Sequence, residues 1–383
     1  MKRLLLVAAL GLVGTRVHPQ GSGRDDARWV LDQAELPQGA TPSATGIQLL
    51  RGIAYRPDLR LRDGIIEFEL GAPAGGFAGL AFRLASAADY EIVYFRPSES
   101  GDRWATVQYQ PVFEGATTWQ LYPGDGYEAS LPRSLVGPIR VRLVVSGRRA
   151  DVHVGSDTVP VLRIAELKRD PAAGGVGFWA ASPASASRPT VLRDFRVHNE
   201  ERPRLAEVAL PPARATQLLR WEISQRFPAG DSGNAPRNLP DSLRLGRMPM
   251  RVVEAEASGL INLTRVLGNP AGPQRANVFG GAGWGVAYAR VRVRSESTQV
   301  RRLSFAYSDR IGVYVDGMRV FSARNDFGTR YPEYLGVVGA EVDAVDVPLK
   351  SGVTDIVLAI TDRAFGWGFR ASFDAMTGLT ILR

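Results

Sequence analysis

The sequence predicts an all-β protein: two antiparallel β-sandwich (jelly-roll) domains in tandem, following an N-terminal signal segment. The first observation is that apolar and polar side chains alternate along residues 65–70 and 141–145, as half-buried strands require. The second is that glycine-containing turns, such as the pair at 146–147, separate these runs at hairpin spacing. The third is scarce helical periodicity, which leaves residues 161–168 and 218–226 as candidates for a few helical turns.

Length and composition allow two cores. The chain has 383 residues, of which 45% are hydrophobic, enough for two domains of about 150 to 180 residues each. It has no cysteine, which excludes disulfides, thiol catalysis and cysteine metal sites. The stability of both domains must therefore come from packing.

The formal charge of +8 raises the question of an acidic partner. Lys2, Lys168 and Lys350 are the only lysines in the sequence, so nearly all of the positive charge is carried by arginine. The arginines are spread along the chain and form no basic run. We therefore expect no nucleic-acid partner.

The N-terminal residues have the composition of a secretory signal. Lys2 and Arg3 precede eleven mostly apolar residues, 4–14, a run too short to cross a bilayer of about 30 Å as a helix. No later segment approaches 18 uninterrupted apolar residues, so no membrane span is expected. We expect residues 1–22 to be the signal peptide and leader, and the mature protein to be secreted or periplasmic.

Composition also divides the rest of the chain. Residues 23–199 show the period-two pattern of a first sandwich. Residues 200–212 are charged and contain proline, as linkers do. Alternation returns within residues 213–383, after a loop at 228–245 that is rich in Gly, Pro, Asn and Asp. The prediction is a sandwich over 23–199, a linker over 200–212 and a second sandwich over 213–383.

The stretch 63–122 carries a dense set of Tyr, Trp, Gln and Arg on short alternating strands. Within it, FRP, SG, QY, P, G and W follow one another in an order that resembles the concanavalin-A-like lectin/glucanase and laminin-G group of β-sandwiches. The resemblance covers residues 29–198 and implies a sandwich of this type. It does not identify a ligand.

The second half resembles a galactose-binding-like jelly roll, the accessory sugar-binding module of many secreted glycosidases. The likeness rests on YSDRIGVYVDGMRVF (307–321), VPLKSGVTDIVLAI (347–360) and FGWGF (365–369). Such modules often hold a structural calcium ion. A calcium ion is therefore possible, but the sequence has no tight Asp/Asn ligand cluster, and we expect no cofactor and no metal.

Sugar binding is the function that these side chains favour. An aromatic ring can stack on the apolar C–H face of a pyranose, while Arg and Gln bond its hydroxyl groups. Trp367 lies between two glycines, which predicts an indole exposed in a loop. Core packing is the competing interpretation for every aromatic. The candidate ligand-binding residues are Tyr94, Arg96, Gln108, Tyr109, Trp119 and Trp367, with Arg103 and Tyr122 in the same stretch as the first five.

Evidence for catalysis is weaker. The three histidines show no HxH or HExxH spacing, and no serine sits in a GxSxG turn. Glu67 and Glu69 are the weak catalytic candidates, because glycoside hydrolysis needs two carboxylates and these share a strand face about 7 Å apart. The glucanases of the group carry a longer acidic run, E-x-D-x-E, which this strand lacks.

The sequence therefore predicts an exported carbohydrate-binding protein of two β-sandwich modules. One alternative is a glycoside-processing hydrolase that uses carboxylates of the first sandwich. A second alternative is a structural or adhesive surface protein without a small-molecule ligand.

Overall fold

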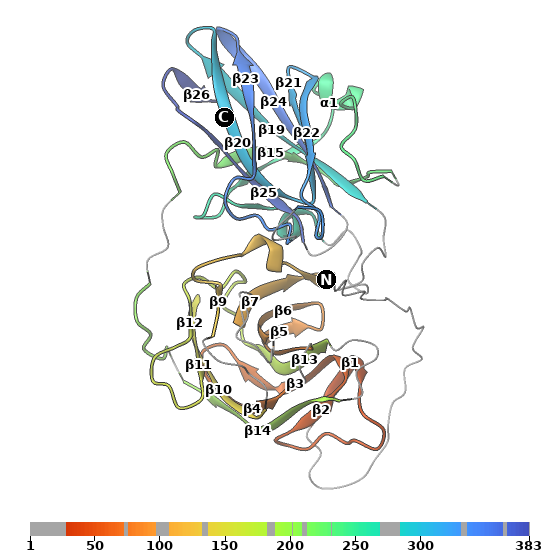
Figure 1. The fold of residues 1–383 in the computed structure, drawn as a ribbon, viewed down its shortest axis with the longest axis vertical. Helices are drawn as coiled ribbons and strands as arrows, with labels where there is room; N and C mark the ends of the chain where they lie inside the picture. Colours follow the sequence, from red (N-terminus) through yellow and green to blue (C-terminus); the bar gives the residue numbers. More distant parts are fainter. Residues whose placement is uncertain are drawn as a thin grey trace, which may run out of the picture. The chain divides into compact units, whose positions relative to one another are not determined.

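The computed structural model confirms the all-β fold class. It describes residues 28–72, 76–96, 107–131, 137–181, 188–200, 202–208, 213–230, 232–268, 284–330, 335–362 and 366–382. These residues form antiparallel sheets with two short α-helices and one 3-10 turn (Figure 1). The predicted signal segment and Arg103 lie outside the described residues.

The described residues form two compact units. Those within Met1–Val112 and Gly124–Ala209 form unit 1, and those within Phe113–Pro123 and Leu210–Arg383 form unit 2. The predicted boundaries place the short stretch Phe113–Pro123 in the first domain, whereas its contacts assign it to unit 2.

Unit 1 is a sandwich of two sheets. In spatial order, sheet 1 runs β1 (Val30–Glu35), β3 (Arg51–Leu61), β13 (Gly174–Ala181), β5 (Phe77–Ser86), β6 (Asp89–Phe95) and β7 (Val107–Phe113), and β9 (Glu128–Ala129) pairs with β7. Sheet 2 runs β12 (Leu162–Ile164), β11 (Arg149–Val154), β10 (Ile139–Ser146), β4 (Gly64–Gly71), β14 (Thr190–Asn199) and β2 (Ile47–Leu49).

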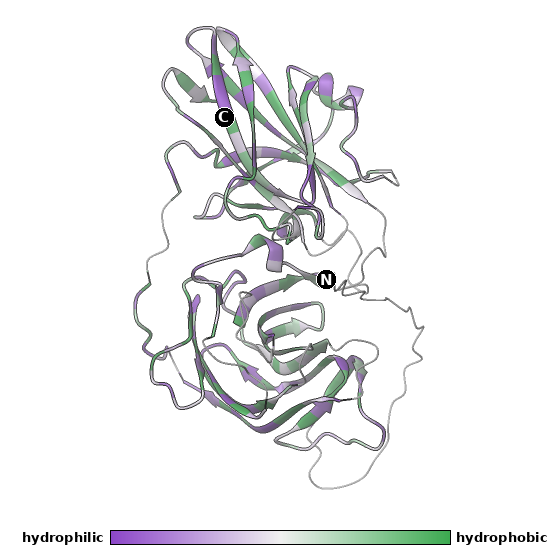
Figure 2. Cartoon of the chain, viewed as in Figure 1, coloured by the Kyte–Doolittle hydropathy of each residue, from purple (hydrophilic) through white to green (hydrophobic). Residues whose placement is uncertain are grey.

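Alternation in β4 explains how the two sheets pack. Its residues are buried and half-buried in turn, with Phe68 on the buried side. The Phe68 ring meets Phe178 of β13 edge-on at 5.2 Å, and Phe178 meets Phe195 of β14 at 5.6 Å. These rings join sheet 2 to one face of sheet 1. Hydrophobic and hydrophilic residues alternate along the strands in Figure 2.

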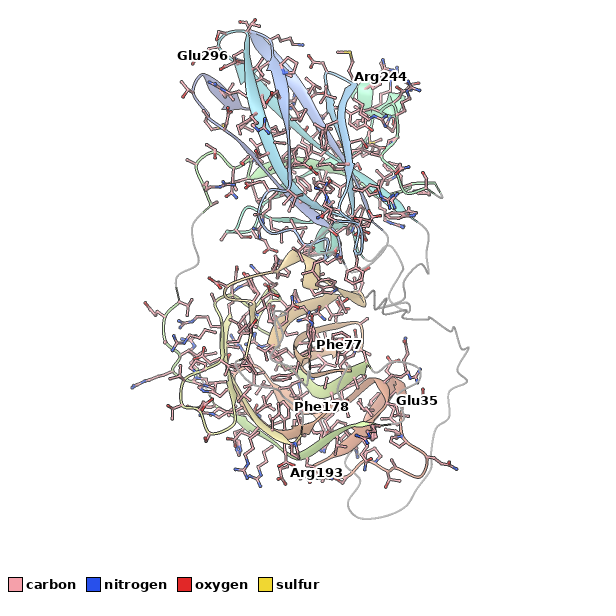
Figure 3. All side chains as sticks on the ribbon, in the orientation of Figure 1. Glu35, Phe77, Phe178, Arg193, Arg244 and Glu296 are labelled. Atoms are coloured by element: carbon pink, nitrogen blue, oxygen red, sulfur yellow. The ribbon has the colours of Figure 1, made fainter. Side chains whose placement is uncertain are left out.

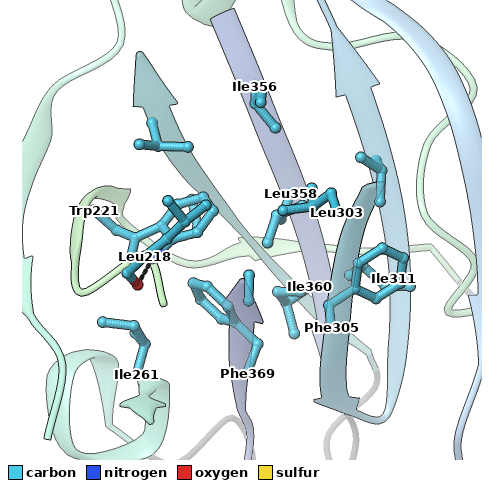
Figure 4. Close-up of a cluster of buried hydrophobic side chains, with 14 of the residues drawn as sticks. Leu218, Trp221, Ile261, Leu303, Phe305, Ile311, Ile356, Leu358, Ile360 and Phe369 are labelled. Atoms are coloured by element: carbon cyan, nitrogen blue, oxygen red, sulfur yellow. Dashed lines mark hydrogen bonds between the residues drawn. The ribbon is translucent and has the colours of Figure 1, made fainter. Parts of the chain in front are cut away.

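Unit 2 also has two sheets. Sheet 3 runs β17 (Met250–Glu254), β15 (Arg220–Ser224), β19 (Gly285–Ser295), β24 (Gly352–Asp362), β21 (Arg310–Val315) and β22 (Met318–Arg324), and both β16 (Phe227–Pro228) and β26 (Leu379–Ile381) pair with β19. Sheet 4 runs β18 (Ile261–Asn262), β25 (Gly368–Phe373), β20 (Gln299–Ser308) and β23 (Asp343–Leu349). The core between them contains Trp221, whose ring meets Phe369 at 5.0 Å (Figure 4).

The two segments that the sequence allowed as short helices form strands. Residues 161–168 contain β12 and residues 218–226 contain β15, so the expectation of helical turns there is wrong. The reason in β15 is that Trp221 and Ile223 alternate with polar residues and fill the core of unit 2. The helices are α1 (Asp241–Arg244) and α2 (Leu263–Leu267).

The stretch Phe113–Pro123 contributes β8 (Ala116–Thr117) and the 3-10 turn η1 (Trp119–Leu121) to unit 2. The Gln120 backbone carbonyl accepts a hydrogen bond from Val338 N at 2.7 Å. The hydroxyl of buried Tyr122 donates to Glu256 Oε1 at 2.6 Å and accepts from Asn262 Nδ2 at 2.9 Å. Buried polar groups of this kind hold the stretch in place.

We therefore expect Tyr122→Phe to destabilise unit 2. The variant leaves Glu256 and Asn262 without this buried hydroxyl, which costs about 1–3 kcal/mol of unfolding free energy. The matched control is Tyr288→Phe, because Tyr288 is also buried in unit 2 and its hydroxyl makes no hydrogen bond with a described residue. Urea unfolding of the full chain measures both, and equal losses would show that the hydrogen bonds of the Tyr122 hydroxyl add no stability.

Candidate functional site

The face of sheet 1 opposite sheet 2 packs on no other described sheet of unit 1, and we call it the free face of sheet 1. Most of its described side chains, among them Ile53, Ile92 and Tyr94, are nevertheless buried in a hydrophobic cluster. Phe178 points toward sheet 2, so its neighbour Trp179 points away from it, because successive side chains of a strand alternate. Figure 3 labels Phe178 and Phe77, the first residue of β5. The cross-strand register then identifies two rows of side chains on the free face of sheet 1. One row is Ile53, Trp179, Gly79, Tyr94, Gln108 and Glu128, and the next is Tyr55, Gly177, Ala81, Ile92 and Gln110.

Three aromatic rings meet at one end of this face. The Tyr94 ring lies 5.9 Å from Trp179 and 6.2 Å from Phe77, in edge-to-face geometry, and Phe77 lies 6.5 Å from Trp179. Tyr94 is buried, Trp179 is half-buried and Phe77 is 38% exposed. The cluster therefore presents accessible ring edges and faces beside a buried anchor.

A polar group lies directly on the aromatic cluster. The Arg96 guanidinium sits 4.8 Å from the Tyr94 ring centroid and donates to the Tyr94 hydroxyl at 2.5 Å. The same guanidinium donates to Gln108 Oε1, which also accepts from the Tyr94 hydroxyl at 2.6 Å. Burial raises the pKa of Tyr94 to about 12, so its phenol remains a neutral hydrogen-bond donor at physiological pH.

Gln110 has an unusual environment on the same face. It is 2% exposed, and its Oε1 atom is buried with no hydrogen-bond partner in the described part of the chain. Buried amide oxygens are nearly always hydrogen-bonded, because leaving one unpaired costs about 1–3 kcal/mol. The Gln110 side chain therefore offers an acceptor oxygen that forms no hydrogen bond with another described residue.

Two glycines make room for the aromatic rings. A Cβ atom at Gly79 would lie 2.8 Å from both Tyr94 Cβ and Ile92 Cδ1. A Cβ atom at Gly177 would lie 2.4 Å from Tyr55 Cβ. Both distances are below van der Waals contact, so these positions have to lack a side chain for the neighbouring rings to lie across the sheet.

Tyr109, another predicted binding residue, lies on the opposite face of sheet 1. It pairs with Val93, next to Tyr94 in β6, and so points into the sandwich. Its hydroxyl donates to buried Glu91 at 2.5 Å and accepts from Lys168 N at 2.7 Å. Burial raises the pKa of Glu91, although Tyr109 and the amide of Arg169 both donate hydrogen bonds to its carboxylate.

Trp119 and Trp367 lie in unit 2. Trp119 is half-buried and meets Phe327 edge-on at 6.0 Å. The expectation that Trp367 is exposed in a loop is wrong, because its side chain is 0% exposed in the core of unit 2. Its flanking glycines serve close packing, since a Cβ at Gly366 would lie 2.7 Å from Thr118 Cγ2 and one at Gly368 would lie 2.6 Å from Ile261 O. Glycine on both sides thus allows backbone approach without exposing the ring.

Glu67 and Glu69 lie on the outer face of sheet 2, away from the free face of sheet 1. The register places Glu67 between Arg142 and Arg196, and Glu69 between Arg140 and Arg193. Both glutamates are half-buried, and Glu67 also lies 3.8 Å from His198 Nε2. This is the arrangement of a solvated ladder of opposite charges.

The free face of sheet 1 therefore unites Tyr94, Arg96 and Gln108 of the predicted set. Sequence reasoning missed Phe77, Trp179 and Gln110. Trp179 lies outside the stretch 63–122 from which most candidates were drawn, and the signal that could have found it is its alternation with Phe178 in β13. In the described ranges, no group of three or more His, Asp or Glu side chains could hold a metal ion, and no helix is long and apolar enough to cross a membrane.

No protein-family model matches the chain, and neither does any curated protein sequence. Solved structures with partial similarity include the carbohydrate binding module CBM66 from Bacillus subtilis, 14% identical with a TM-score of 0.31 over 44% of this chain and 92% of that one. A tetrameric galectin from the ball sponge Cinachyrella sp. is 13% identical with a TM-score of 0.27, over 38% and 99%. A GH43 protein from Bacillus licheniformis is 12% identical with a TM-score of 0.27, over 39% and 32%. At this level of similarity, the function has to be argued from the residues of this chain.

We expect Gly79→Ala to disturb the aromatic cluster. The added methyl group would press on Tyr94 Cβ, which cannot move without its strand, and we expect a loss of about 1–3 kcal/mol in unfolding free energy. Gly71→Ala is the control, since the nearest atom to its added Cβ would be 3.9 Å away. Urea unfolding and the near-ultraviolet circular dichroism of the aromatic rings measure the effect. An unchanged spectrum and stability for Gly79→Ala would show that the rings do not depend on this glycine.

The raised pKa of Glu91 predicts that the unfolding free energy of the protein depends on pH. Its folded pKa is raised by burial, so its stabilising contribution is complete below the unfolded pKa of about 4.3 and is lost as the pH rises through the folded value. We expect the unfolding free energy of the wild type to fall more steeply with rising pH in this window than that of Glu91→Gln. Parallel urea titrations from acid to neutral pH provide the comparison, and superimposable slopes would refute a raised pKa at Glu91.

Proposed function

We propose that this chain is a carbohydrate-binding protein whose ligand lies on the free face of sheet 1. The observation that supports this most strongly is the convergence of three aromatic rings with Arg96 and Gln108 on a face that packs on no other sheet of unit 1. Aromatic side chains gathered there are not needed to join sheets 1 and 2, which Phe68, Phe178 and Phe195 already hold together.

The chemistry of the face suits a sugar ring. The accessible parts of Phe77 and Trp179 can stack on the C–H groups of a pyranose, which present an apolar surface. Arg96 can donate to ring hydroxyls while it remains positioned by Tyr94 and Gln108. Gln110 Oε1 offers an acceptor for a hydroxyl donor, which would satisfy an atom that the described residues leave unpaired.

The proposal extends to the organisation of the chain. The basic start and apolar residues 4–14 support export, and the motifs of residues 63–122 support a concanavalin-A-like or laminin-G-like sandwich in the first domain. The motifs at 307–321 and 347–360 support a galactose-binding-like jelly roll in the second. In this arrangement the two modules form one exported protein that binds glycans.

We expect Trp179→Ala to weaken glycan binding by about tenfold or more, the scale of losing about 1.4 kcal/mol of stacking. A glycan array on the mature protein selects the ligand, and calorimetry then measures the affinities. Trp29→Ala is the control, because Trp29 packs on Phe195 of sheet 2 at 6.0 Å and belongs to neither row of the free face. Equal affinities for both variants would move the binding site away from this face.

A second variant separates binding from stability. Gln110→Leu removes the unpaired oxygen, so we expect the folded state to keep or gain stability while glycan affinity falls. A variant that retains full affinity would mean that the ligand does not reach Gln110. If neither Trp179→Ala nor Gln110→Leu affects the selected glycan, the proposed function of this face fails.

A further inference from the structure

Unit 2 contains a cavity that the proposed glycan face does not involve. Its volume is about 440 Å³, within the usual range of ligand pockets, about 300–1,000 Å³. It lies between the turn joining β21 to β22 and the segment that leads into α1. The cavity is lined by Arg237, Asn238, Arg244, Gly317, Met318 and Arg319, which we call the arginine pocket.

The arginine pocket carries an excess of positive charge. Three of its lining residues are arginines and none is acidic. Asp241 is near, but it is mostly exposed and contacts Arg244 at 3.4 Å. The carboxylate of Asp316, at the turn, accepts hydrogen bonds from Lys350 Nζ at 2.8 Å and from the backbone amide of Asp355 at 2.9 Å. The acidic side chains beside the pocket therefore leave most of its charge unneutralised.

The fold orients two of the three guanidinium groups. Arg319 Nη1 donates to the carbonyl oxygens of Ala235 and Pro236, both at 3.3 Å, which directs it toward the chain just before Arg237. A Cβ atom added at Gly317 would lie 4.0 Å from Arg244 Nε, so the Arg244 side chain passes close to this glycine. Arg319 lies on β22, which pairs with β21, and Arg244 is the last residue of α1.

Arg237 differs from the other two. It is exposed and makes no hydrogen bond or ion pair with any residue that the structure describes. The positive charge of Arg237 is repelled by the positive charges of Arg244 and Arg319. An anion bound in the pocket would attract all three guanidinium groups. Each guanidinium can present two parallel N–H donors to the oxygens of the anion.

We propose that the arginine pocket binds an anionic group with three terminal oxygens, a sulfate or phosphate monoester carried on a small polar molecule such as a sugar. Three arginines match a group with three terminal oxygens better than a carboxylate, which has two. The Asn238 amide can bond a neutral hydroxyl of the same molecule. The volume leaves room for a carrier of monosaccharide size.

The test uses the full chain and calorimetric titration with glucose 6-sulfate, glucose 6-phosphate, glucuronate and glucose at constant chloride concentration. We expect one or both monoesters to bind and to bind more weakly as ionic strength rises. Arg237→Ala should weaken the binding by about tenfold or more, since a hydrogen bond between charged groups is lost. Stability should stay unchanged, because Arg237 supports no described contact.

The matched control is Arg251→Ala. Arg251 is an exposed arginine of β17 that also lacks a described partner and lies outside the arginine pocket. Loss of binding in Arg237→Ala with full binding in Arg251→Ala supports the proposal, and the better of the two monoesters identifies sulfate or phosphate. Equal weakening in both variants, equal binding of glucose, tightest binding of glucuronate, or no binding of either monoester at millimolar concentration would overturn it.

Discussion

The antiparallel register across β13, β5, β6 and β7 is the constraint on which the candidate site depends. It sets Trp179, Gly79, Tyr94 and Gln108 in one row, although they come from four separate strands. A slip of one residue in β6 would turn Tyr94 toward the inside of the sandwich and bring Val93 to the free face, because side chains alternate. The close approach of Tyr94 and Trp179 also requires the absence of a side chain at Gly79.

The two faces of sheet 1 use tyrosine for different purposes. Tyr109, on the inner face, connects Glu91 to the backbone of Lys168 and keeps a buried carboxylate hydrogen-bonded. Tyr94, on the free face, positions Arg96 and Gln108 beside accessible rings. The inner tyrosine is hydrogen-bonded to other residues of unit 1, whereas Gln110 Oε1 on the free face has no hydrogen-bond partner among the described residues. That difference favours the free face as the place where a ligand contributes the missing partner.

The places where arginine side chains gather also depend on the tertiary structure. The arginines form no basic run in the sequence, yet Arg237, Arg244 and Arg319 meet at one pocket because the β21–β22 turn lies beside the segment before α1. On sheet 2, Arg140, Arg142, Arg193 and Arg196 come from two strands and flank Glu67 and Glu69 of the strand between them. Linear spacing of charges therefore does not predict where a positive surface forms.

The sequence by itself determined the all-β class and the pairing of two strands. Alternation in residues 65–70 and the turn at 146–147 correspond to β4 and to the hairpin β10–β11, because these signals act between near neighbours. It also grouped Tyr94, Arg96 and Gln108; Tyr94 and Gln108 pair across β6 and β7, and Arg96 directly follows β6. These features need no knowledge of distant contacts.

The tertiary structure alone decided which aromatics face outward and which stretch belongs to which unit. β7 is buried along its whole length, so alternation of hydrophobicity could not separate Tyr109 from Gln108 and Gln110. Trp179 joins the site through pairing between strands far apart in the chain, and Trp367 is buried because glycines let neighbouring backbone pack against it. Such long-range pairing and close packing depend on the positions of all strands together, which local sequence patterns do not specify.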